Sequence, residues 1–138
     1  MALLGLDVGD KRIGIALSEG RLAVPSDVLE RTTEAEDLER IAALIRKCDA
    51  ERIVIGLPRS MDGSIGTQAE SVLAFSKALA NHISIPIEMC DERLTTVTAN
   101  RLLQESGAKR KQRKANIDAM AAAVILQAYI DGAKKGSA

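Results

Sequence analysis

The stretch LLGLDVGDKRIGIALS, residues 3–18, decides the fold expected for this chain. It holds two apolar runs, and Gly9 and Gly14 permit a tight strand-turn-strand hairpin between them, around residues 10–11. The same glycines let a second backbone or a phosphate group approach closely. Asp7 stands in the first run, where a lone carboxylate is costly to bury unless a cation meets it. Asp7 is therefore a candidate metal ligand or phosphate-site residue, and the alternative is an ordinary Asp-x-Gly turn at a strand end.

Length and composition indicate one ordinary globular domain, residues 1–138, of which 46% are hydrophobic and 28% charged. The longest apolar run, residues 119–126, is far shorter than the ~20 residues that a membrane span needs. Cys48 and Cys90 show no metal-type spacing, and the single histidine, His82, is expected at a helix end. We therefore expect a cytoplasmic protein with no zinc site and no membrane partner.

The formal net charge of zero hides a strongly basic segment near the C-terminus. Its basic residues are Lys109, Arg110, Lys111, Arg113 and Lys114. A block of like charges repels itself, so residues 108–115 are expected to form a mobile loop. The loop either contacts nucleic-acid phosphates or is a solvated connector between two helices. Phe75 and Tyr129 are the only aromatic residues, so nucleic-acid binding would rest on phosphates and shape rather than on base stacking.

Hydrophobic periodicity predicts alternating strands and helices along the rest of the chain. Strands are expected at residues 3–8, 13–18, 28–31, 52–57 and 85–90. Helices are expected around residues 38–45, after Thr67 as the cap, at 95–105 and at 117–133, with a frayed tail at 134–138. A hairpin followed by this alternation predicts an α/β domain, with a mixed central sheet and helices on both faces.

Two further carboxylates stand where such a sheet presents functional groups. Glu92 comes directly after a predicted strand, at the end where open α/β sheets bind ligands, although it could also be a solvated loop acid. Asp118 falls in the first turn of the last helix, on the same side as a largely apolar stripe. A favourable interaction with the helix N-terminus is the alternative for Asp118. Small alanines in residues 119–123 keep this end of the helix thin, so it could lie close to the strand that carries Asp7.

Three carboxylates that meet at one point repel one another, and a divalent cation relieves the repulsion. Oxygen-only ligation suits Mg²⁺ or Mn²⁺, and two such ions can promote hydrolysis of a phosphodiester. In this scheme Asp7 bridges two ions, while Glu92 and Asp118 hold one each. The cations that would grip flanking phosphates are Lys11, Arg12, Arg93 and the basic segment at 108–115.

Several segments, in this order along nearly the whole chain, resemble the YqgF/RuvX family. They are GLDVGDKRIG at 5–14, GLP at 56–58 with MDGS at 61–64, DERLTT at 91–96, and Asp118-Ala119 leading to ILQ at 125–127. The resemblance implies an RNase H-like fold related to the RuvC resolvases. It also implies a nuclease that matures the 5′ end of pre-16S rRNA, with Asp7, Glu92 and Asp118 on the family's acidic triad.

The sequence leaves other functions open. A junction resolvase would cut branched DNA symmetrically and would need a stable two-fold dimer, whereas we expect a monomer or a weak homodimer. A non-catalytic nucleic-acid or transcription-complex module would keep the fold without needing all three acids. An actin-like or sugar-kinase ATPase begins with a similar hairpin, but 138 residues leave no room for a second lobe. The sequence separates neither RNA from DNA nor Mg²⁺ from Mn²⁺.

Overall fold

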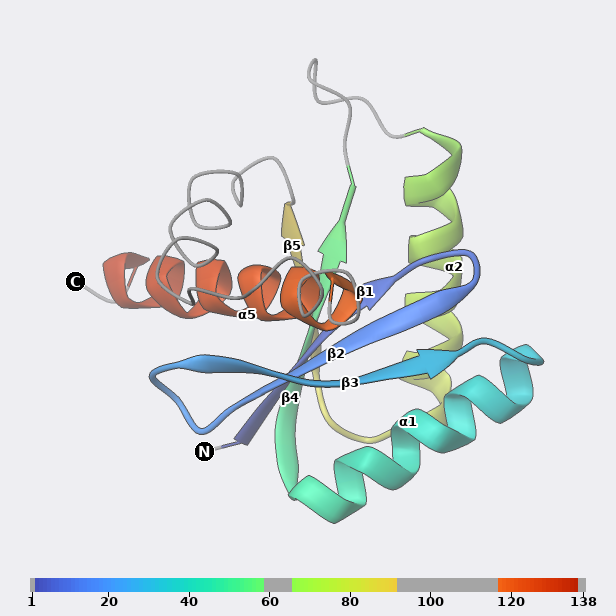
Figure 1. The fold of residues 1–138 in the computed structure, drawn as a ribbon, viewed down its shortest axis with the longest axis horizontal. Coiled ribbons are helices and arrows are strands. Elements are labelled where there is room, and N and C mark those ends of the chain that lie inside the picture. The colour runs from blue at the N-terminus through green and yellow to red at the C-terminus, as the bar shows by residue number, and fades with distance from the viewer. Residues whose placement is uncertain (1, 59–65, 92–116, 137–138) are drawn as a thin grey trace.

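The computed structural model describes residues 2–58, 66–91 and 117–136, and it is a mixed five-stranded sheet with helices on both faces (Figure 1). The strands are β1 (Ala2–Val8), β2 (Arg12–Ser18), β3 (Ala23–Glu30), β4 (Ala50–Leu57) and β5 (Ile87–Asp91). The helices are α1 (Glu34–Cys48), α2 (Thr67–His82) and α5 (Ile117–Gly136). The predicted helix at 95–105, the basic segment and residues 59–65 lie outside the described residues.

The strand order is β3-β2-β1-β4-β5. β1, β2 and β3 pair antiparallel, and β4 and β5 run parallel to β1. The turn of the first hairpin is closed by the Gly9 N–H, which donates to the Arg12 carbonyl oxygen at 2.9 Å. The predicted hairpin is thus confirmed. Because β1, β4 and β5 are parallel, their carboxyl ends meet at one edge of the sheet, beside the turn of this hairpin.

Alternation of side chains along the strands divides the core into two layers. Leu4 and Leu6 of β1 pack in the layer that α1 and α2 cover. Leu3 of β1 and Val54 of β4 pack instead against α5, on the opposite face. The prediction of helices on both faces of the sheet is confirmed.

Helix α5 crosses the sheet at glycines of two neighbouring strands, Gly5 of β1 and Gly14 of β2. A Cβ atom on Gly5 would lie 2.8 Å from the Cβ of Leu126. A Cβ atom on Gly14 would overlap the carbonyl group of Asp118. Farther along the helix, the buried Gln127 accepts a hydrogen bond from the Ala23 N–H at 2.9 Å. Close approach of a second backbone at Gly14 is therefore confirmed, as is the closeness of this helix to the strand of Asp7.

β3 is longer than predicted and begins at Ala23 rather than at residue 28. Pro25 and two polar residues after it hid the strand from the periodicity. Pro25 is tolerated because β3 is an edge strand of the described sheet and because the register shifts beside Pro25's partner, Ala16. The predicted cap of α2 was also wrong, since Gly66 is the N-cap and Thr67 is the first helical residue.

The remaining helix ends agree with the sequence in part. α5 ends at Gly136, so residues 134–136 of the expected frayed tail are helical. His82 ends α2 as expected, and its ring nitrogen lies 3.0 Å from the Glu39 carboxylate of α1. Hydrogen bonds from His82 and Arg46 lower the pKa of Glu39.

In the described parts of the chain, no helix combines the length and apolarity needed to cross a membrane.

Candidate active site

Asp7 lies near the carboxyl end of β1, directly across the hairpin from Gly14. It shares its face of the sheet with Leu3 and Gly5, which both contact the α5 layer. Asp7 is partly exposed, unlike Leu6 and Val8 on either side of it, which are buried in the other layer. The strand therefore presents this carboxylate on the α5 face, at the edge where the parallel strands end.

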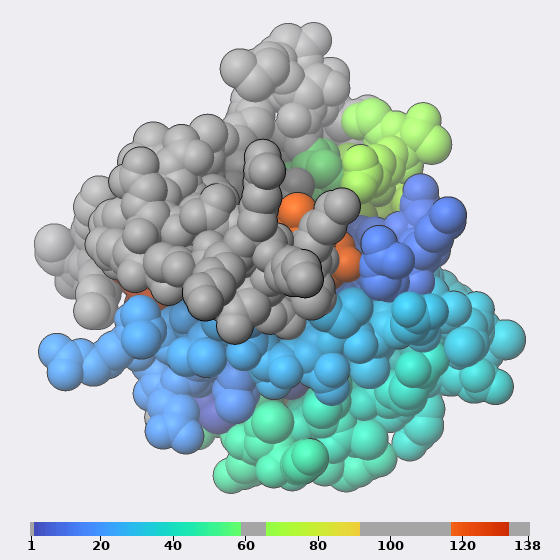
Figure 2. All heavy atoms as spheres, in the orientation of Figure 1, coloured from blue at the N-terminus to red at the C-terminus, as the bar shows by residue number. Residues whose placement is uncertain are grey.

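The first turn of α5 brings Asp118 to the same place. Its carbonyl group packs on Gly14, the residue paired with Asp7. In Figure 2 the start of α5, in orange, lies beside the β1–β2 hairpin, in blue. Gly14 is thus the common neighbour of Asp7, its partner across the hairpin, and of the Asp118 backbone, which packs on it. This placement is consistent with the prediction that the start of the last helix lies close to the strand of Asp7.

The Asp118 side chain forms an ion pair with Arg12, the first residue of β2. The Arg12 Nε donates to Asp118 Oδ2 at 2.9 Å, and the side chains are 50% and 31% exposed, respectively. Arg12 follows the hairpin turn and lies two residues before Gly14 on β2, and therefore on the same face as the Asp7–Gly14 pair. A cation therefore already balances part of the negative charge at this edge.

A buried carboxylate, Asp37, braces the hairpin from the other side. Asp37 is 1% exposed and binds Arg31 (Nε–Oδ2, 3.2 Å) and the Thr32 N–H (3.1 Å). Arg31 in turn donates to the Gly9 carbonyl oxygen at 3.0 Å, and its guanidinium lies over the Phe75 ring. The turn between Asp7 and Arg12 is therefore tied to α1 and α2. Sequence reasoning missed this brace, although Asp37 stands four residues before the fully buried Ile41 and so shares its inward face.

Replacement of Asp37 by alanine is expected to lower the free energy of unfolding by about 2–4 kcal/mol. The substitution leaves Arg31 largely buried without its carboxylate and leaves the Thr32 N–H without an acceptor. Urea unfolding followed by circular dichroism measures the loss. Glu36→Ala is the control, because Glu36 is exposed and should cost under ~1 kcal/mol. Equal losses in the two variants would contradict a bracing role for Asp37.

The other predicted site residues lie outside the described part of the chain. These are Glu92, Arg93, Lys109, Arg110, Lys111, Arg113 and Lys114. Glu92 directly follows Asp91, the last residue of β5, in the sequence. Among the residues that the structure does describe, no group of three or more His, Cys, Asp and Glu side chains is arranged to hold a metal ion. The structure thus places Asp7 and the backbone of Asp118 beside Gly14, while Glu92 lies outside the described residues.

The donors at this edge are carboxylate oxygens, which suit a hard divalent cation such as Mg²⁺ or Mn²⁺. Of the described histidine and cysteines, His82 ends α2, Cys48 ends α1, and Cys90 is buried in the core beneath α5. The residues present therefore fit an oxygen-ligated ion. A carboxylate pair beside an arginine can hold such an ion next to a phosphate group.

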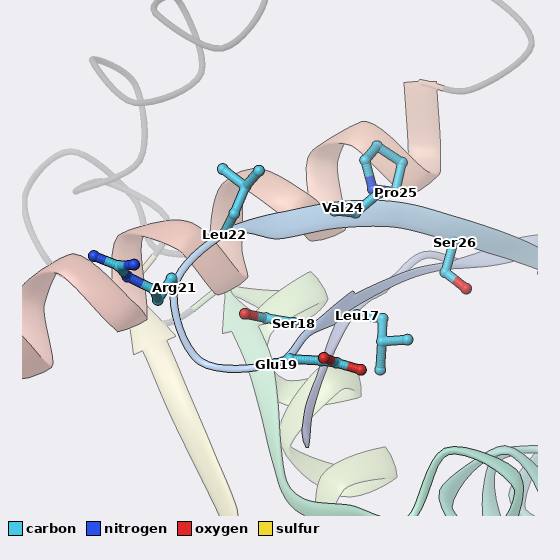
Figure 3. Close-up of a pocket in the computed structure, with 8 residues that line it drawn as sticks. All are labelled: Leu17, Ser18, Glu19, Arg21, Leu22, Val24, Pro25 and Ser26. Carbon is cyan, nitrogen blue, oxygen red and sulfur yellow. The ribbon is translucent and has the colours of Figure 1, made fainter. Parts of the chain in front are cut away.

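An open cavity of about 750 Å³ lies at the opposite end of β2 (Figure 3). Its lining comes from the β2–β3 turn and the adjoining strands: Leu17, Ser18, Glu19, Arg21, Leu22, Val24, Pro25 and Ser26. Arg12 and Gly14 occupy the other end of this strand, so the cavity is separate from the carboxylates. Its size alone does not make it the site of chemistry.

Comparison with solved structures defines the class of fold. The chain superposes on the Thermus thermophilus RuvC in complex with Holliday junction substrate with a TM-score of 0.66 and 15% identity, covering 100% of this chain and 98% of that one. For the fowlpox virus Holliday junction resolvase, the TM-score is 0.59 at 9% identity, with 96% and 99% covered. The fold is therefore the RNase H-like fold of the RuvC-type resolvases.

Comparison of the sequence with known proteins identifies the family as well as the fold. Residues 1–132 match the RuvX family, described as a Holliday junction resolvase, and the chain belongs to this family. A relative from Desulforamulus reducens, named "Putative pre-16S rRNA nuclease", is 46% identical over 98% of this chain and 100% of its own length. A relative of the same name from Clostridium acetobutylicum is 46% identical over 95% and 98%. The predicted family and fold class are confirmed.

Proposed function

We propose that this chain is a divalent-metal-dependent nuclease that hydrolyses phosphodiester bonds and processes the 5′ end of pre-16S rRNA. The observation that carries the proposal is the placement of Asp7 and Asp118, from opposite ends of the chain, beside the same glycine: Asp7 pairs with Gly14 across the hairpin, and the Asp118 backbone packs on it. Carboxylates brought to one end of a sheet repel one another, and a divalent cation relieves that repulsion. The names of the relatives supply the RNA substrate.

In the proposed site, Asp7, Asp118 and Glu92 would hold Mg²⁺ or Mn²⁺ through their carboxylate oxygens. When bound, such an ion stabilises the charge that develops on the phosphate during hydrolysis. The protein's own part is to keep the carboxylates in place. Gly14 fixes the start of α5, and the Asp37–Arg31 brace fixes the turn after Asp7.

Phosphates flanking the cleaved bond are proposed to contact Lys11, Arg12, Arg93 and the basic residues Lys109, Arg110, Lys111, Arg113 and Lys114. Lys11 and Arg12 support this role because both are exposed on the hairpin beside the carboxylates. Binding that rests on phosphate contacts weakens steeply as salt is added. We also propose that the protein acts in the cytoplasm, as a monomer or a weak homodimer.

Resolution of branched DNA is the second candidate, and the likeness of the fold to RuvC bound to a Holliday junction favours it. Symmetric cutting of two strands requires two active sites related by a two-fold axis. A resolvase would therefore be a stable dimer on its substrate, whereas a nuclease that trims one RNA end would not need to be.

Cleavage of two labelled substrates distinguishes these functions. A 16S precursor RNA with its 5′ extension and a four-way DNA junction are each incubated with the protein and Mg²⁺, Mn²⁺ or EDTA. We expect cleavage of the RNA near the mature 5′ end, with either ion and not with EDTA. Symmetric cutting of the junction with the RNA left intact would favour the resolvase. If both substrates are bound but neither is cut, the chain is a binding module and the proposal is wrong.

A further inference from the structure

We infer that Arg12 is the resident counter-ion of Asp118 and that a divalent ion must displace it to reach this carboxylate. The inference rests on the proposed function, because it concerns the same metal site. In addition to that site, we infer that Arg12 and the ion compete for the Asp118 carboxylate. Binding of the ion would then change the position of a cation beside the reacting phosphate.

Asp118 is the fixed partner of the ion pair. Its carbonyl group is pressed against Gly14, which is buried in a central strand, so the first turn of α5 has no room to shift toward the sheet. The helix is held again at Gly5, where Ala122 and Leu126 pack on the strand, and by Gln127 on β3. The backbone that carries the Asp118 carboxylate therefore stays in place whether or not the carboxylate is paired.

Arg12 is the partner that can move. The Arg12 side chain is 50% exposed, long and flexible. Arg12 is also the first residue of β2 after the turn. Ion pairs this exposed contribute little stability, with a typical range of ~0–1 kcal/mol. A doubly charged ion that gains Asp7 as a second ligand can overcome an interaction of that size. Arg12 can thus balance the charge of Asp118 and still be displaced from it.

Release of Arg12 would place a free guanidinium next to the loaded site. The bound ion repels it, and its nearest attractive partner becomes a phosphate of the substrate, to which arginine can donate two hydrogen bonds. Arg12 would thus bind the nucleic acid chiefly when the metal is present. The ion pair would then couple metal binding to substrate binding at one residue.

The Nε–H resonance of Arg12 in a ¹H–¹⁵N spectrum reports the ion pair directly, without any cleavage. The resonance is assigned by its absence in Arg12→Lys. We expect it to move during a Mg²⁺ titration toward its position in Asp118→Asn, where the acceptor is weakened. An unchanged resonance in a protein that binds Mg²⁺ would overturn the inference and leave the proposed function intact.

Affinity for Mn²⁺, measured by calorimetry in the absence of nucleic acid, gives the second readout. Arg12→Gln is expected to bind Mn²⁺ about two- to fivefold more tightly than the wild type, the range set by an exposed ion pair. Lys11→Gln is the matched control, because it removes the same charge from the same turn. We expect a smaller change for Lys11→Gln. Weaker Mn²⁺ binding by Arg12→Gln, or equal gains in the two variants, would overturn the inference. No Mn²⁺ binding by any of the proteins would overturn the inference and the proposed metal dependence together.

Discussion

Replacing Gly14 with alanine is expected to lower the free energy of unfolding by about 3 kcal/mol and to abolish the carboxylate site. The new Cβ would occupy the space of the Asp118 carbonyl group and press on the Ala119 nitrogen, both of which are backbone. Backbone cannot rotate away as the end of a side chain can, so α5 must lift from β2 or the strand must bend. Overpacking of this kind typically costs ~1–3 kcal/mol, and a contact with a helix backbone belongs at the upper end. Chemical denaturation measures the loss.

Gly132→Ala is the matched control, since it makes the same change in α5 at a position where a Cβ would meet nothing within 4 Å. It should be neutral or stabilising by up to ~1 kcal/mol, because alanine favours a helix more than glycine does. If Gly14→Ala unfolds at the wild-type midpoint and keeps Mn²⁺ affinity, the close packing of α5 on β2 is wrong. Loss of Mn²⁺ affinity without loss of stability would mean that the helix moves and that the fold tolerates it.

Asp7→Asn is expected to reduce metal-dependent cleavage by about 100-fold or more while leaving the fold intact. The substitution keeps the shape of the side chain, which is partly exposed and not in the buried core. It removes one negative charge from the proposed ligand set. Metal stabilisation of the reacting phosphate contributes several kcal/mol, and each 1.36 kcal/mol is a tenfold change in rate. Single-turnover cleavage of the 16S precursor RNA measures the effect.

Asp10→Asn serves as the control for this second prediction, because Asp10 is exposed in the turn of the same hairpin and carries the same charge. Its cleavage rate should stay within about threefold of wild type, as expected for a surface charge screened by solvent and salt. RNA affinity in EDTA should not fall in Asp7→Asn, since removing a negative charge cannot weaken binding to a polyanion by electrostatics. Wild-type cleavage by Asp7→Asn would remove Asp7 from the proposed site.

The hairpin and the family could be predicted from the sequence because their signals are local. Apolar alternation and two glycines lie within residues 3–18, and the apolar stripe behind Asp118 lies within one helix. The pairing of Arg12 with Asp118 has no such signal, since 106 residues separate the two side chains and no local pattern links them. The full length of β3 was hidden for a different reason: a bulge and an edge position make Pro25 acceptable where propensity opposes it.

The brace at Asp37 shows how composition can mislead. Among neighbouring acids at the start of α1, Asp37 reads as one member of an exposed acidic cluster. Helical spacing separates it from the others, because it shares a face with Ile41 while Glu34 and Glu36 are exposed. Its partner, Arg31, comes from the end of β3, and only tertiary packing brings the Gly9 carbonyl to the same guanidinium. Periodicity could have predicted that Asp37 is buried, but not what it binds.

Anomalous scattering from a crystal of the protein soaked in Mn²⁺ shows whether both carboxylates bind the ion. We expect an anomalous peak ligated by carboxylate oxygens of both Asp7 and Asp118, and no such peak in crystals of Asp7→Asn. A fully occupied manganese ion bound elsewhere, with Asp7 and Asp118 making no contact to metal at saturating Mn²⁺, would contradict it.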